Sequence, residues 1–71
     1  MNIYCVRHKL DCYGVYVAAE TRNKAKLYWA YEENEPFIDA RCSAVMHDVD
    51  VESGYVTLED GERLGLQGEE L

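Results

Sequence analysis

The sequence predicts an α+β fold, in which one helix packs on one face of a three-stranded, antiparallel-type sheet. Three observations support this prediction. An apolar, β-branched run at 15–19 leads directly into a helix-forming run at 22–33. Residues 2–8 before this unit and residues 37–46 after it alternate in the manner of strands. The predicted order of elements is therefore strand, strand, helix, strand.

The first two strands are predicted to form a hairpin. Residues 2–8 alternate, so neighbouring side chains point to opposite faces of the sheet. Residues 9–13 have the composition of a hairpin connection, and Gly14 after them indicates a turn or a close backbone approach. The second strand then occupies residues 15–19.

The helix is predicted at residues 22–33, where no Gly, Pro or β-branched residue opposes helix formation. Thr21 is the predicted N-cap, and Pro36 ends the helix. The face expected to cover the sheet consists of Ala25, Leu27, Tyr28 and Tyr31, with Trp29 at its border.

The third strand, at residues 37–46, is predicted to lie beside the first. A right-handed crossover through the helix makes it parallel to the second strand and gives the order 2-1-3. One helix covers only one face of this sheet. We expect the C-terminal segment or a second copy of the chain to cover the other face, unless that face is exposed.

The C-terminal third is polar and acidic. Residues 47–54 are expected to form a loop with at most a short extended piece. Residues 55–66 fit either a hairpin or a short helix at 58–64, and the helix is favoured because it has capping residues at both ends. We therefore expect a single domain over 1–66 and a frayed tail at 67–71.

The composition indicates a cytoplasmic protein. The hydrophobic runs are far shorter than the roughly 20 residues of a membrane span. The N-terminus has no basic region followed by an apolar one, so no signal peptide is expected. Three cysteines, an odd number, indicate free thiols in a reducing compartment rather than a disulfide framework.

The net charge of −7 lies entirely in the second half of the chain. Residues 1–35 hold five basic and five acidic side chains, whereas residues 36–71 hold two basic and nine acidic ones. This balance argues against direct binding of nucleic acid or of an anionic membrane. It fits a solvated acidic surface or a face that meets a basic protein partner.

Three stretches together resemble a known group of proteins. A short two-stranded opening, the words AETRNKAK leading into an aromatic helix, and the closing words EDGERLGL resemble small uncharacterised proteins of bacterial phages and integrated mobile elements. The resemblance covers most of the chain and implies no catalytic residue. It implies a cytosolic accessory protein, of prophage type, that modulates a host or phage protein.

A zinc site is the alternative function that the sequence suggests. The chain offers five candidate ligands, which are Cys5, His8, Cys12, Cys42 and His47. Structural zinc sites use four such groups, usually in close pairs, and the spacing here is loose. Buried cysteines that act as small hydrophobic residues explain Cys5 and Cys42 better. We therefore predict no cofactor and no metal, and the absence of a catalytic motif indicates a protein that is not an enzyme.

The favoured prediction is a small protein-interaction module. Six tyrosines and one tryptophan are many for 71 residues, and one helix cannot cover them all. We predict an exposed aromatic patch, and we expect either this patch or the acidic second half to contact an unidentified, basic protein or a second copy in a homodimer. The residues expected to form this binding surface are Tyr4, Tyr16, Trp29, Asp48, Asp50 and Glu52.

Overall fold

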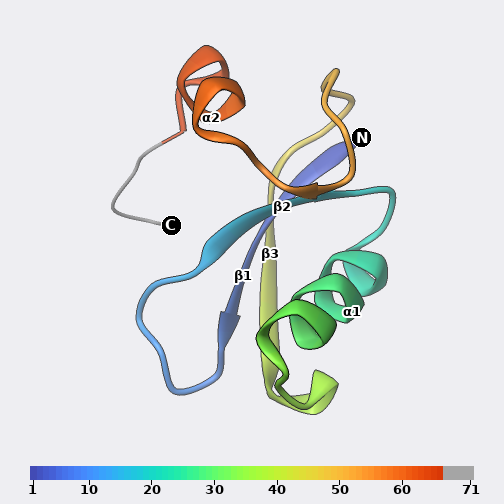
Figure 1. Cartoon of the computed structure of the whole chain (residues 1–71), viewed down its shortest axis with the longest axis vertical. Coiled ribbons are helices and arrows are strands. Elements are labelled where there is room, and N and C mark those ends of the chain that lie inside the picture. The colour runs from blue at the N-terminus through green and yellow to red at the C-terminus, as the bar shows by residue number, and fades with distance from the viewer. Residues whose placement is uncertain (67–71) are drawn as a thin grey trace.

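A computed structural model describes residues 1–66 as a four-stranded antiparallel sheet with helices on both of its faces (Figure 1). The sheet order is β3-β1-β2-β4. The strands are β1 (Asn2–His8), β2 (Val15–Ala19), β3 (Ala40–Met46) and β4 (Gly54–Tyr55). The helices are α1 (Arg22–Glu33) and α2 (Leu58–Leu64), and a 3-10 turn spans Phe37–Asp39.

The hairpin of β1 and β2 has the predicted position, with Cys5 opposite Tyr16 in its register. Gly14 allows the two strands to come close at the loop end of the hairpin. A Cβ atom there would lie 2.6 Å from the backbone oxygen of Val6 and 2.9 Å from the Sγ of Cys5. The prediction of a close backbone approach at this glycine is confirmed.

Helix α1 has the predicted bounds and caps. The Thr21 side chain accepts a hydrogen bond from the Lys24 amide, and Asn34 ends the helix in the left-handed conformation. The predicted helix face is only half right. Ala25 and Trp29 are the buried residues, while Leu27 and Tyr31 are 57% and 83% exposed.

Two long basic side chains help to determine which face of α1 meets the sheet. Arg22 lies 6.0 Å from the centre of the Tyr4 ring, and Lys26 lies 5.1 Å from that of Phe37. Their aliphatic stems can cover apolar surface while their charges stay in water.

Strand β3 begins three residues later than predicted. Phe37–Asp39 forms a 3-10 turn, in which the Asp39 amide donates to the carbonyl of Pro36. Ile38 lies in this turn and is exposed. The predicted arrangement of the first three strands, with β1 between β2 and β3, is confirmed.

The sheet has four strands, which corrects the prediction of three. The short strand β4 pairs with β2, with Tyr55 opposite Val17. Two residues show no alternation, so the sequence pattern could not reveal this strand. Helix α2 forms as favoured, with Thr57 capping its start and Gly65 its end.

The sheet separates two apolar clusters. One lies under α1 and contains seven buried residues, among them Val6, Val17 and Trp29. The other lies on the opposite face, where Ile3, Tyr16 and Ala18 are covered by apolar residues between 49 and 66. The C-terminal segment thus covers part of the face that α1 leaves open.

The predicted frayed tail at 67–71 lies outside the described residues. Neither α1 nor α2, the two α-helices between residues 1 and 66, has the length and apolar character that crossing a bilayer requires.

Candidate functional site

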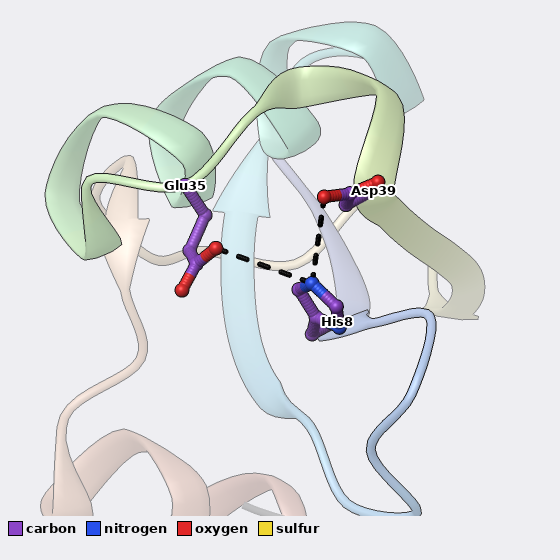
Figure 2. Close-up of side chains that lie close together, drawn as sticks. All are labelled: His8, Glu35 and Asp39. Carbon is purple, nitrogen blue, oxygen red and sulfur yellow. Dashed lines mark ion pairs between the residues drawn. The ribbon is translucent and has the colours of Figure 1, made fainter.

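Three ionisable side chains meet where β1 ends beside the C-terminal end of α1. His8 is the last residue of β1, Glu35 follows α1, and Asp39 ends the 3-10 turn. Figure 2 shows the imidazole of His8 between the two carboxylates. Its Nε2 lies 3.5 Å from Asp39 Oδ2 and 4.0 Å from Glu35 Oε2.

The local chain path brings these residues together. The left-handed Asn34 ends α1 and turns the chain, so that Glu35 leaves toward the sheet. The Lys9 amide donates to the Asp39 carbonyl at 2.8 Å, which fixes the 3-10 turn against the end of β1. The three side chains therefore come from segments that are distant in sequence but tied by backbone bonds.

Asp39 is ionised in this arrangement. Its Oδ1 lies 3.1 Å from the ammonium of Lys9. The hydrogen bond from Lys9 holds the pKa of Asp39 below its ordinary value of 3.8, against the opposing effect of burial. The carboxylate is thus already engaged by one cation.

The hydrogen bonds of His8 define its tautomer. The Leu10 amide donates to Nδ1 at 3.1 Å, so Nδ1 carries no proton. A neutral imidazole then has its proton on Nε2 and presents an N–H to Asp39 and Glu35. This N–H lies nearer to Asp39, at 3.5 Å, than to Glu35, at 4.0 Å.

The same geometry tests whether the cluster suits a metal ion. One ligand atom from each of His8, Glu35 and Asp39 lies within 4.8 Å of the others. A metal would require the Nε2 lone pair, which here holds a proton, and the Lys9 ammonium lies against Asp39. The donor set therefore fits an internal hydrogen-bonded group better than a cation site.

The cluster borders an open hollow of about 410 Å³, here called the His8 hollow. His8 and Trp29 lie side by side in it, with ring centres 6.4 Å apart. The lining has three carboxylates and one guanidinium, together with aromatic and aliphatic side chains. Its residues are Val6, Arg7, His8, Leu10, Asp11, Tyr13, Gly14, Val15, Trp29, Glu33 and Glu35.

Glu33 joins the His8 hollow to β4. Its carboxylate accepts a hydrogen bond from the Tyr55 hydroxyl, and the Tyr55 ring packs edge-on against Tyr28 at 5.0 Å. Burial, and then the bond to Glu33, raise the pKa of Tyr55 well above its ordinary value of 10.0. Tyr55 is therefore a donor that holds one carboxylate of the hollow in place.

The aromatic residues predicted to form a surface are buried. Tyr4, Tyr16 and Trp29 are only 5%, 3% and 5% exposed, because both faces of the sheet carry packed layers. Tyr4 lies under α1, and Tyr16 lies under the C-terminal segment. Of the three, only Trp29 lines the His8 hollow. The exposed aromatic rings are those of Tyr13, Tyr31 and Phe37.

The predicted acidic residues are exposed but stand apart from this site. Asp48, Asp50 and Glu52 lie in the loop between β3 and β4. The backbone of this loop is held by Asn2, whose side chain accepts from the Asp48 amide, and by Arg63, which donates to the Asp50 carbonyl. Whether these carboxylates contact a partner stays a prediction.

The five candidate zinc ligands do not gather at one place. Within residues 1–66, His8 is the one member of the predicted set that belongs to a group of three potential ligands. Cys5 and Cys12 line a separate hollow with Arg7, Cys42 packs at the edge of the cluster under α1, and His47 is exposed. The wide spacing of the five candidate ligands in the sequence agrees with their separation in the structure.

Sequence reasoning missed the acidic residues of the site. Nothing in the spacing of the sequence indicates that Glu33, Glu35 or Asp39 lies near His8. The available signal was Pro36, which ends the helix and directs the chain back toward β1. The pairing itself depends on how β3 joins β1 and could not be read from spacing.

Comparison with family models, curated proteins and solved structures finds no match to this chain. The function must therefore be argued from the residues themselves.

Proposed function

We propose that this chain is a small protein-interaction module that receives a basic side chain of a partner protein in the His8 hollow. The observation that carries the proposal is the lining of that hollow, which combines the acidic side chains of Asp11, Glu33 and Glu35 with the rings of Tyr13 and Trp29. Carboxylates and aromatic rings are the groups that bind ammonium and guanidinium ions.

The chain's own cations near the hollow are already engaged. The Arg7 guanidinium donates to the carbonyls of His8, Lys9 and Asp11 at 3.2, 3.4 and 2.9 Å. It thus holds the β1–β2 turn in shape. Lys9 pairs with Asp39. Arg7 is thus bonded to the backbone and Lys9 to another acid. The carboxylates of the hollow therefore remain available to a cation from a partner.

The aromatic residues define how a basic side chain enters. Tyr13 is 68% exposed at the mouth, whereas Trp29 is 5% exposed and lies deeper beside His8. A long arginine or lysine stem can pack on the open tyrosine while its charge reaches Glu33 and Glu35. A cation that stacks on the exposed Tyr13 ring instead gains about 0.5–1 kcal/mol from the cation–π contact.

The cellular setting is part of the proposal. The resemblance to phage and mobile-element proteins supports an accessory protein of prophage type that binds a host or phage protein. Cys5, Cys12 and Cys42 are not joined in disulfide bonds, which is typical of the reducing cytoplasm.

Trp29 provides the test, because it is the single tryptophan of the chain. We would titrate the protein with an arginine-rich peptide and record tryptophan fluorescence. The expected result is a saturable change that weakens with salt and is absent for an acidic peptide of the same length. Glu35→Gln should weaken binding by up to about fivefold, as expected for loss of one exposed ion pair.

Glu52→Gln is the matched control, because it removes an exposed carboxylate from a loop that does not line the hollow. It should bind the basic peptide as the unmodified chain does. A change in affinity equal to that of Glu35→Gln would mean that net charge alone attracts the peptide. That result, or the lack of any saturable signal, would exclude the His8 hollow as the binding site.

A further inference from the structure

The two edges of the sheet differ in length. Strand β4 ends one side with only two residues, whereas the seven-residue β3 forms the other side and pairs with β1 alone (Figure 1). An edge strand of this length offers a row of backbone donors and acceptors to another extended chain. The outer side of β3 is therefore a candidate interaction surface.

The hydrogen bonds show which backbone groups of β3 point outward. The Asp39 carbonyl accepts from the Lys9 amide, so this residue faces β1. In an antiparallel pair successive residues alternate in direction. Arg41 and Ser43 then also face β1, which leaves the carbonyls of Ala40, Cys42 and Ala44 and the amides of Cys42 and Ala44 on the outer side. The Ala40 amide donates to the Phe37 carbonyl in the 3-10 turn.

Two arginines cover the outward carbonyls. The Arg41 guanidinium donates to the Ala40 carbonyl at 3.1 Å, and the Arg22 guanidinium donates to the Cys42 carbonyl. Both bonds are exposed or only partly buried. These side chains occupy the positions where the amides of an added strand would donate.

The outer side of β3 is thus basic in a chain whose net charge is −7. Arg22 and Arg41 lie on it, and the positive charges of Arg22 and Lys26 oppose the rise in the Cys42 pKa that burial causes. The two arginines come from opposite faces. Arg22 extends from α1, whereas Arg41 alternates with Ala40 and Cys42, which pack under α1.

We propose that the outer side of β3 binds an extended, acidic segment of another protein by strand addition. The amides of that segment replace the two arginines as hydrogen-bond donors to the carbonyls of Ala40 and Cys42. The displaced guanidiniums pair with the carboxylates of the segment. Because adjacent residues of a strand point to opposite faces, two consecutive acidic residues reach Arg22 and Arg41 together.

Charge also distinguishes this partner from a second copy of the chain. Antiparallel pairing of β3 with another β3 would bring four arginines to one seam, and like charges opposite each other destabilise a strand pair. An acidic segment removes this repulsion. This surface is independent of the His8 hollow, which is acidic and lies at the end of the sheet.

The test uses ¹⁵N-labelled protein and three synthetic peptides of one extended, β-branched framework, whose central pair is Glu-Glu, Gln-Gln or Lys-Lys. The Glu-Glu peptide should shift the amide signals of Cys42 and Ala44 and leave those of α2 unchanged. Arg22→Gln combined with Arg41→Gln should reduce its affinity at least about tenfold, for two lost charge-assisted pairs.

Arg63→Gln is the control, because Arg63 is an exposed arginine of α2 that pairs with Asp60. It should leave the affinity for the Glu-Glu peptide unchanged. A second variant, Ala44→Pro, removes an outward amide while sparing the bonds to β1, and it should also lose binding if circular dichroism shows it folded.

Several results would overturn the proposal. Equal binding of the Gln-Gln peptide would show that the arginines do not recognise acids. No binding would show that the arginines only shield the edge. A dimer in sedimentation that the arginine substitutions strengthen, with no response to the acidic peptide, would assign the edge to a second copy.

Discussion

At the scale of single residues, His8 shows how one hydrogen bond decides the chemistry of a site. The Leu10 amide occupies Nδ1, so the proton of the neutral ring lies on Nε2, between Asp39 and Glu35. A histidine that ligates a metal usually has the reverse arrangement, with its second nitrogen donating to an acceptor. The imidazole is set up to donate, not to ligate.

We therefore expect zinc and EDTA to leave the thermal midpoint of unfolding unchanged. A metal bound to the folded chain would raise the midpoint increasingly as its concentration exceeds its dissociation constant, and a chelator would reverse the rise. Differential scanning calorimetry of the unmodified chain and of His8→Gln measures this directly. A zinc-dependent rise that His8→Gln abolishes would contradict the tautomer.

Asp39 gives a prediction about acid stability. Its folded pKa lies below the ordinary 3.8, so its contribution to the free energy of unfolding is present above that value. The contribution is lost as the pH falls through the lowered folded pKa. The stability difference between the unmodified chain and Asp39→Asn should thus be constant above pH 3.8 and shrink below it.

Urea unfolding at a series of pH values measures that difference. Glu62→Gln, at an exposed acid of α2, serves as the comparison. A difference for Asp39→Asn that stays constant down to the most acidic point would show that Lys9 does not stabilise the ionised carboxyl.

At the scale of elements, the ends of α1 and α2 follow from local chemistry, whereas the buried face of α1 does not. Thr21, Asn34, Thr57 and Gly65 cap the helices through contacts within one turn, which a sequence displays. The rotation of α1 depends on Trp29 fitting under the sheet and on Arg22 reaching the carbonyl of Cys42. These contacts join residues far apart in the chain.

The structure also gives partners to the charged side chains at the two ends of α1. Basic residues at its start and acidic ones at its end oppose the helix dipole. In the structure Lys24 pairs with Glu20 at 3.7 Å, Lys26 lies over Phe37, and Glu33 accepts from Tyr55. These contacts thus offset the unfavourable interaction of the charges with the helix dipole.

Gly14 in the β1–β2 hairpin and Gly61 in α2 offer a matched pair of glycine substitutions. Gly14→Ala should lower the free energy of unfolding by about 1–3 kcal/mol, because the new Cβ would lie 2.6 Å from the Val6 oxygen. Gly61→Ala should raise it by up to about 1 kcal/mol, since Gly61 lies inside α2 with nothing within 4 Å of a Cβ.

Chemical unfolding of both variants measures these changes. Opposite signs are expected. A Gly14→Ala variant as stable as the unmodified chain would mean that the hairpin can shift to accept a methyl group, and that close approach does not require glycine there.

At the scale of the whole molecule, the sequence was enough for the order of the first three strands and for both helices. Periodic runs and caps are local signals, and a right-handed crossover determines how they connect. The fourth strand was missed because Gly54 and Tyr55 are only two residues. The site was missed because His8, Glu35 and Asp39 meet only after β3 pairs with β1.

The separation of the apolar residues by the sheet has a consequence for how the molecule opens. The layer that covers Ile3 and Tyr16 is built from residues between 49 and 66, and α2 itself buries no side chain. We expect this layer to detach in a partial, reversible opening while α1 stays on the sheet. In native-state hydrogen exchange, amides of α2 should exchange through a lower free energy of opening than those of β1. The chain would then behave as two cooperative units that share one sheet, and a partner could stabilise one unit without changing the other.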